Sequence, residues 1–366
     1  MSEHAIPFPP AGAPGLERER RLAEIRRQAE EGQRSGRGIR PKGAPFPKAS
    51  PQTGYYGIPL LKPPQWTHQI PLYLFVGGAA GAAAVVSAIA HYVGAERKLV
   101  RDARSIAAAG AVISPALLIA DLGRPERFMN MLRVFKPQSP MSVGAWTLAG
   151  FGSAVSAATF AGLIRQRYGP SFPLAMIENA GEAAAIPLGL GLATYTGVLI
   201  GATVIPVWNQ NAANLPLHFA ASGVGAAVGL LELMGHTRSR ALQTLGLGAA
   251  IFEVWEGLGI EARSHSHLTP LKQGTSGAIT RVGGALSGPI PAALRLASMF
   301  GRSRRTASLR RWAAICSVAG SFLTRVAWMR AGVASSRDWR QALEISPHAE
   351  SWPDMHPQSG HPSKAR

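Results

Sequence analysis

Residues 121–146 read DLGRPERFMNMLRVFKPQSPMSVGAW, a proline-rich and charged segment. An apolar run of about twenty residues lies on each side of it, and that length suits an α-helix that crosses the hydrocarbon core of a bilayer. The first sixteen positions hold four basic and two acidic residues. A short loop between two membrane spans needs no such charge. The segment is therefore predicted to dock another molecule at a membrane surface.

Composition extends the membrane interpretation to most of the chain. Of 366 residues, 46% are hydrophobic and only 16% are charged. Between residues 69 and 332 the sequence falls into eight apolar blocks, at residues 70–93, 105–122, 142–164, 184–206, 214–235, 241–260, 279–300 and 309–332. We therefore expect an all-α integral membrane protein, an eight-transmembrane-helix bundle over residues 54–332, with polar tails at 1–53 and 333–366.

The polar ends carry much of the positive charge. Lys and Arg number 38 against 20 acidic residues, and many lie in the tails and in short loops, so no nucleic-acid partner is expected. Residues 1–50 lack the pattern of a cleavable signal peptide. A short surface helix is predicted at residues 16–33, and disorder is predicted for the rest of that tail and for the tail after residue 341. The single cysteine, Cys316, excludes an internal disulfide and a cysteine-ligated iron–sulfur cluster.

The distribution of basic residues gives conflicting indications of topology. Loops after the odd-numbered blocks hold more Lys and Arg than the opposite loops, which predicts that both termini lie outside. The basic N-terminal tail favours the reverse orientation. Small residues four apart recur in three blocks and predict close helix packing, at Gly77 and Gly81, Gly197 and Gly201, and Gly225 and Gly229.

Several common redox and metal sites are not expected. A haem with two histidine ligands needs paired histidines at one depth, but His68, His91 and His218 each lie near the end of a block. His265 and His267 have no Cys or acidic residue at a metal-binding spacing. The sequence therefore predicts no haem and no metal in this chain.

Polar residues in or beside the apolar blocks are the remaining candidates, because ionisable groups at membrane depth are costly and often functional. A quinone fits them physically, since it needs an apolar slot, hydrogen-bond donors at its oxygens and a route for protons. His68, Tyr73 and Tyr195 are the candidate quinone-binding residues. Trp66 and Trp208 are interpreted as interface aromatics. Glu232, Glu253 and Glu256 form a candidate proton path; pairing of Glu253 and Glu256 with Arg263 or Arg281 is the alternative.

Motifs across residues 54–332 support a specific resemblance. They include Asp121–Pro125, Met131–Val134, Ser139–Ser142 with Trp146, Tyr55–Pro59, Tyr195–Gly197, Ile205–Trp208 and Glu253–Gly274. In these stretches the chain resembles the NrfD/polysulfide reductase membrane-subunit family. The resemblance implies an eight-helix subunit of the bacterial cytoplasmic (inner) membrane that binds a quinone or quinol, either menaquinone or ubiquinone.

The resemblance also implies partners. Electrons would be exchanged with a ferredoxin-like iron–sulfur subunit, which connects to a molybdopterin or cytochrome catalytic subunit. By position, His68, Tyr73 and Tyr195 match the family's quinone pocket, and the partner-docking residues are Asp121, Arg124, Arg127 and Arg133. Two other functions stay open at this point, a proton translocator and a purely structural anchor without quinone chemistry.

Overall fold

The computed structural model describes residues 61–122, 125–300 and 303–338, together with Arg20, Ala23, Glu24, Arg27 and Gln341. The chain divides into two compact units, Met1–Pro45 and Phe46–Arg366. In the first unit the four described residues are helical, within the helix predicted for 16–33. The structure does not describe the tail residues for which disorder is predicted. It also does not describe the Tyr55–Pro59 motif or Arg124.

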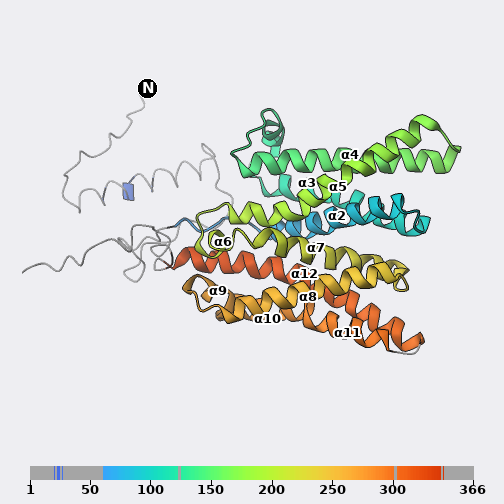
Figure 1. The fold of residues 1–366 in the computed structure, drawn as a ribbon. Coiled ribbons are helices and arrows are strands. Elements are labelled where there is room, and N and C mark those ends of the chain that lie inside the picture. The colour runs from blue at the N-terminus through green and yellow to red at the C-terminus, as the bar shows by residue number, and fades with distance from the viewer. Residues whose placement is uncertain are drawn as a thin grey trace, which may run out of the picture. The chain divides into compact units, whose positions relative to one another are not determined.

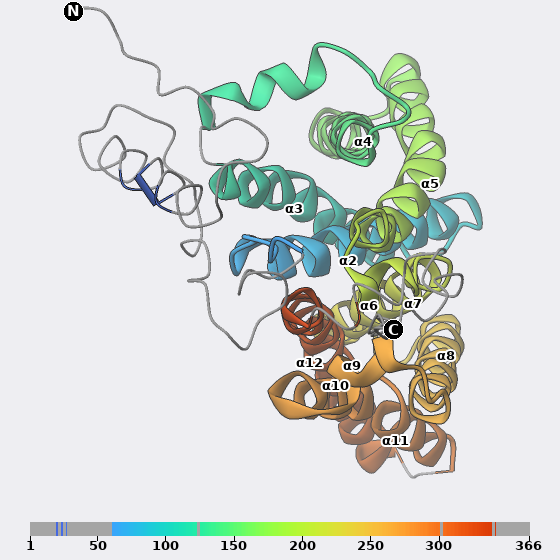
Figure 2. The same ribbon diagram turned by 90° about the vertical axis from the view of Figure 1, so that its left-hand side faces the viewer.

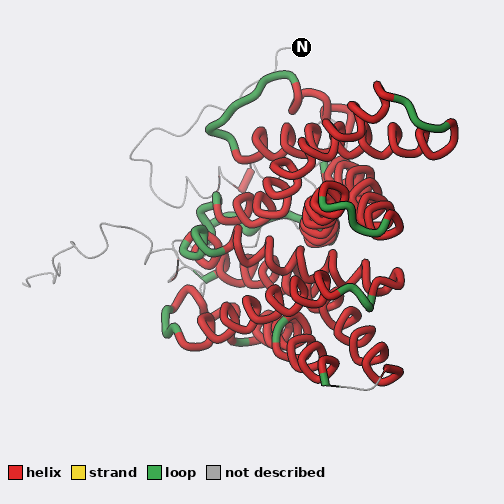
Figure 3. Tube along the Cα trace, turned by 45° about the vertical axis from the view of Figure 1, so that its right-hand side comes forward, coloured by secondary structure: helices red, strands yellow, loops and turns green. Residues whose placement is uncertain are grey.

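Every apolar block forms helix, as predicted (Figures 1 and 3). The long helices are α2 (Gln69–Tyr92), α3 (Arg97–Asp121), α4 (Pro140–Tyr168), α5 (Phe172–Gly201), α7 (Leu215–Leu231), α8 (Arg240–Ala262) and α12 (Ser303–Arg337). The seventh block is split into α10 (Gly274–Ser287) and α11 (Pro289–Met299). Short elements are η2 (Pro125–Leu132), α6 (Pro206–Asn209), η3 (Glu232–His236), η4 (Ser266–Leu268) and α9 (Thr269–Lys272). The described residues contain no strand.

Six described helices are long and apolar enough to cross a membrane, namely α2, α3, α4, α5, Leu215–His236 and Thr306–Arg337. The all-helical prediction is confirmed, but the count of eight spans is not. Helix α8 carries two glutamates inside its apolar stretch, which lowers its mean hydropathy. Helices α10 and α11 have 14 and 11 residues, each too short to span alone. The last helix also continues to Arg337, beyond the predicted boundary at residue 332.

The helices run back and forth, so their connections gather at two ends. We call one the α6 end, formed by residues 122–139, 202–214 and 263–273, and the other the η3 end, formed by residues 93–96, 169–171 and 232–239. Figure 1 shows the α6 end on the left and the η3 end on the right. Figure 2 looks onto the α6 end, with α2, α5 and α7 between the α3–α4 side and the α8–α11 side.

Glycines let the central helices touch backbone to backbone. A Cβ added at Gly81 of α2 would lie 2.5 Å from the carbonyl oxygen of Gly189 in α5, too close for any side chain. Similar tight contacts at Gly197, Gly201 and Gly229 confirm the packing predicted there. Gly77 and Gly225, the other members of two of the predicted pairs, make only ordinary van der Waals contacts: an added Cβ would lie 3.6 and 3.9 Å from its nearest atom.

Enlarging Gly81 should separate α2 from α5. We expect Gly81→Val to destabilise the bundle by about 1–3 kcal/mol or more, the usual cost of overpacking a dense interior. Gly248→Ala is the matched control, because its added Cβ meets nothing within 4 Å. Thermal unfolding in detergent measures both variants. Equal melting temperatures for Gly81→Val and the wild type would contradict the packing.

Candidate functional site

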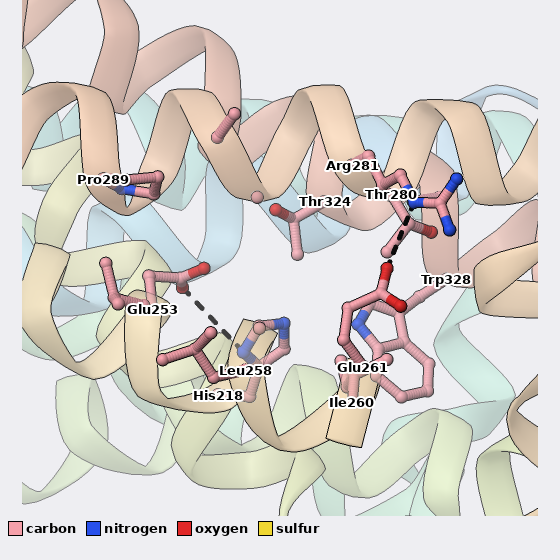
Figure 4. Close-up of a pocket in the computed structure, with 15 residues that line it drawn as sticks. His218, Glu253, Leu258, Ile260, Glu261, Thr280, Arg281, Pro289, Thr324 and Trp328 are labelled. Carbon is pink, nitrogen blue, oxygen red and sulfur yellow. Dashed lines mark hydrogen bonds and ion pairs between the residues drawn. The ribbon is translucent and has the colours of Figure 1, made fainter. Parts of the chain in front are cut away.

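A cavity of about 330 Å³ lies among α7, α8, α10 and α12 (Figure 4). Its walls are mainly apolar and include Val254, Leu258, Ile260, Ala327 and Trp328. The polar groups that line it are His218, Glu253, Glu261, Thr280, Arg281 and Thr324. Such a cavity suits a mostly apolar ligand that carries a few hydrogen-bonding atoms.

His218 and Glu253 form the buried polar part of the cavity. Both residues are nearly inaccessible, at 5% and 4% exposure, and His218 Nδ1 lies 3.9 Å from Glu253 Oε1. Both ring nitrogens of His218 and Oε1 of Glu253 make no hydrogen bond within the described part of the chain. Buried polar atoms are normally satisfied, because leaving one unpaired costs about 1–3 kcal/mol. These three atoms therefore lack a partner in residues that line the cavity, although each exposes less than 1 Å² of surface.

Local structure explains why Glu253 sits there. The Ser287 hydroxyl, in the last residue of α10, donates a hydrogen bond of 2.8 Å to Glu253 Oε2. Gly288 follows and packs against α8, where an added Cβ would lie 3.1 Å from the Val254 nitrogen. Pro289 begins α11 and also lines the cavity. The break between α10 and α11 thus brings the N-terminus of α11 close to a carboxylate, and helix N-termini favour negative charge.

The other end of the cavity is charged and open. Glu261 and Arg281 form an ion pair of 3.1 Å there, with side chains 48% and 63% exposed. Figure 4 places this pair away from Glu253, across the apolar walls. The alternative pairing of Arg281 with Glu253 or Glu256 is therefore not the one the structure adopts. The cavity connects an exposed ion pair with a buried acid and a buried histidine.

Arg325, which the sequence analysis did not select, adds a positive charge next to the cavity. Its guanidinium is fully buried in α12, 4.9 Å from the centre of the Phe219 ring. It donates hydrogen bonds to the Phe219 carbonyl and to the hydroxyls of Ser222 and Ser321. Glu253 is its electrostatic neighbour. Its position inside the apolar block 309–332 is the sequence signal that could have identified it.

The predicted quinone residues lie at the α6 end but face different helices. His68 is exposed at the start of α2 and lines a groove of about 260 Å³ against α12. Tyr73 is buried and is an electrostatic neighbour of Tyr195. The Tyr195 hydroxyl donates a hydrogen bond to the Pro140 carbonyl. The structure therefore brings the two tyrosines together and turns His68 toward another face.

The charged segment after α3 is anchored to the bundle and otherwise exposed. Asp121 accepts a hydrogen bond from the Thr67 hydroxyl, which ties the end of α3 to the segment before α2. Arg127 and Arg133 are exposed, and so are the apolar side chains of Met129, Val134 and Phe135. A groove of about 410 Å³ runs between η2 and the start of α4. Basic and apolar groups thus share one accessible surface.

The other buried acids near the η3 end are paired. Glu232 accepts two hydrogen bonds from Arg295, of 2.7 and 2.8 Å, with both residues buried. Arg104 contacts both Glu178 and Glu182 in the same way. Glu256, the third predicted proton-path residue, is buried one turn after Glu253. Glu253 thus differs from the paired acids because its hydrogen bond and its ion-pair contact in the described residues are with Ser287 and His218 and not with an arginine.

The six helices that are long and apolar enough to cross a membrane define a multi-pass helical membrane protein. The family model described as polysulphide reductase, NrfD, matches residues 61–249, just over half of the chain. The chain belongs to this family, whose members are membrane subunits of respiratory oxidoreductases and assemble with other subunits of those enzymes. The match includes His218 and ends before Glu253. No curated protein shows significant similarity to the chain.

Removing the partner of Arg295 should destabilise the bundle. We expect Glu232→Gln to cost about 3–5 kcal/mol, because it leaves a buried guanidinium without its counter-ion. Glu261→Gln is the control, since its ion pair with Arg281 is exposed and its loss leaves no buried charge. Thermal unfolding of the two variants should differ clearly. Similar melting temperatures would show that Glu232 does not hold Arg295 in place.

Proposed function

We propose that this chain is the quinone-reactive membrane subunit of a respiratory oxidoreductase. It exchanges electrons between the quinone pool of a bacterial inner membrane and an iron–sulfur partner at the α6 end. The observation that carries the proposal is the buried His218–Glu253 pair, two residues that line an apolar cavity and have polar atoms without a hydrogen-bond partner in the described residues. The eight apolar blocks are proposed to cross the membrane eight times, with the α10–α11 pair as a discontinuous span.

The cavity suits the headgroup of a menaquinone or ubiquinone. Its volume of about 330 Å³ lies at the lower end of the range of ligand pockets, about 300–1,000 Å³. Leu258 and Trp328 supply apolar walls, while His218 and Glu253 supply hydrogen-bonding atoms. Leu258 is 66% exposed on the outer face of α8, where a lipid tail would lie. The isoprenoid tail can therefore leave the cavity without crossing the bundle.

We assign to this chain the proton-transfer steps of quinone chemistry. A quinol that is oxidised releases two electrons and two protons. His218 has an unpaired ring nitrogen positioned to accept a hydrogen bond from a headgroup hydroxyl, and histidine is well suited to accept its proton near neutral pH. Glu253, 3.9 Å away, stabilises the positive charge that forms on the ring. In quinone reduction the same groups donate protons.

A second placement of the quinone, at His68, Tyr73 and Tyr195, remains a prediction from the family resemblance. The proton path through Glu232, Glu253 and Glu256 is likewise proposed; in this structure Glu232 is held by Arg295. The electron-carrying groups are assigned to the partners, an iron–sulfur subunit and a molybdopterin or cytochrome catalytic subunit. The basic and apolar surface around η2 supports docking of such a partner.

Substitution of His218 should stop quinone turnover. In the purified complex we expect His218→Ala to lower kcat/KM for a quinol by about 10²–10⁴-fold, the usual contribution of a positioned acid–base group. His91→Ala is the matched control, because His91 pairs with Asn179 at the η3 end. Turnover is followed by quinol absorbance.

Two further variants separate the possible quinone sites. If the quinone lies at the tyrosines, Tyr195→Phe and His68→Ala should abolish turnover while His218→Ala leaves it intact. That result would move the site. A wild-type complex without any quinol turnover would reject the proposed function itself.

Reversing charge on η2 should weaken partner binding. We expect Arg127→Glu together with Arg133→Glu to slow association with the iron–sulfur subunit about tenfold and to reduce its salt dependence, as expected when rim charges are lost. Arg167→Glu, at the exposed η3 end, is the control. Surface plasmon resonance at several salt concentrations measures both. Unchanged association would show that these arginines do not face the partner.

A further inference from the structure

The groove of about 260 Å³ beside His68 is separate from the cavity around His218. One wall is formed within residues 64–71, which comprise the segment before α2 and the start of that helix, and the other is one face of α12 within residues 322–333. No residue lines both spaces, because α12 turns different faces to them. We call this space the α2–α12 groove.

The wall before α2 is held in place by its packing. Trp66 lines the groove and stacks on the fully buried Trp208, with ring centres 5.3 Å apart and planes 14° from parallel. The hydroxyl of Thr67, which also lines the groove, donates a hydrogen bond to Asp121 at the end of α3. Contacts with two other helices thus fix this segment, so the groove is already formed in the absence of a ligand.

The α12 wall changes from apolar to charged along the helix. Phe322, Val326 and Arg330 line the groove at intervals of four residues, so they share one face of α12. At 1.5 Å per residue, Arg330 lies about 12 Å nearer the α6 end than Phe322. Phe322 meets Phe75 of α2 edge-on, with ring centres 5.7 Å apart. The groove is therefore apolar toward the middle of the bundle and cationic at its mouth.

The mouth of the groove is free to bind an anion. Arg330 is exposed and makes no hydrogen bond or ion pair with the described residues. His68, on the opposite wall, is exposed as well, and so is Lys62, two residues before Pro64. None of the described residues that line the groove is acidic. A negatively charged group at the mouth would therefore meet a guanidinium whose donors have no other partner in the described part of the chain.

This order of groups matches a phospholipid with a negatively charged headgroup. The phosphate of such a lipid lies at the membrane surface, and its acyl chains extend toward the bilayer centre. Arginine binds phosphate through charge-assisted hydrogen bonds, and basic pockets between membrane helices bind anionic headgroups. A quinone headgroup is also followed by an apolar tail, but it carries no charge that would require Arg330.

We propose that the α2–α12 groove binds an anionic phospholipid such as phosphatidylglycerol. The phosphate lies between Arg330 and His68, and an acyl chain lies on Val326 in the direction of Phe322. The bound lipid joins the start of α2 to the last part of α12, which are the first and last long helices that the structure describes. This role goes beyond the proposed quinone chemistry and does not depend on it.

Native mass spectrometry of the full chain tests this assignment. The chain is purified in detergent and mixed with equal amounts of phosphatidylglycerol and phosphatidylcholine, and the lipids that stay bound are counted. We expect phosphatidylglycerol to be retained in preference. Arg330→Gln should weaken its binding about fivefold, as expected when one basic residue near an anionic headgroup is lost. Arg167→Gln, at the exposed η3 end, is the matched control.

A second variant tests the shape of the groove separately from its charge. Val326→Trp keeps Arg330 but fills the apolar floor, so we expect it to abolish retention of phosphatidylglycerol. Val112→Trp, at an exposed position of α3, is its control and should retain the lipid. Inorganic phosphate at millimolar concentration should leave the lipid bound, because it has no acyl chain to occupy the floor.

Four results would overturn the proposal. The first is equal retention of the two lipids, and the second is equal weakening by Arg167→Gln and Arg330→Gln, which would indicate attraction to basic charge in general. Complete displacement by inorganic phosphate would assign the groove to a small anion. Displacement by added menaquinone, with menaquinone binding lost in Val326→Trp, would assign it to a quinone. The readout needs no turnover, so it is independent of the His218 experiment.

Discussion

The contact between α2 and α5 at Gly81 and Gly189 constrains the rest of the bundle. In lipid there is no hydrophobic force between helices, so close packing of backbones contributes much of the attraction. Gly78 of α2 extends this contact to Gly223 of α7, and Gly229 of α7 extends it to Ala314 of α12. The small residues thus form one continuous series of contacts from α5 to α12. Two walls of the cavity, α7 and α12, take their positions from it.

Buried charge is arranged differently at the two ends. Toward the η3 end, arginines and carboxylates form ion pairs, and His236 contacts Asp102 at 2.8 Å. A buried pair is costly to break. Nearer the α6 end, His218 and Glu253 have no arginine in ion-pair contact and lie beside an apolar space. Buried carboxylates are therefore held by arginine at one end and by neutral or histidine partners nearer the other.

Sequence alone accounted for the all-helical character and for six helices able to cross a membrane, because length and apolar character identify such a helix without knowledge of its neighbours. It also selected the segment from Asp121 to Trp146. Gly288 and Pro289 are residues that commonly interrupt a helix, and they mark the break in the seventh block. The contact that the break makes with Glu253 depends on another helix and could not be predicted. His218 and Glu253 are 35 positions apart, and no spacing rule relates them across a helix packing. Likewise, Gly77 and Gly81 look alike in sequence, and only packing shows which one touches a backbone.

Trp208 has a consequence for the order in which the protein is completed. Its ring packs on Gly332, where any side chain would overlap it, and its neighbours Trp328 and Ser335 also belong to α12. Helix α12 follows α6 by about a hundred residues in the chain. Until it is inserted, the α6 corner lacks the surfaces that hold it. The α6 corner is therefore completed only after α12 has been synthesised and packed against it.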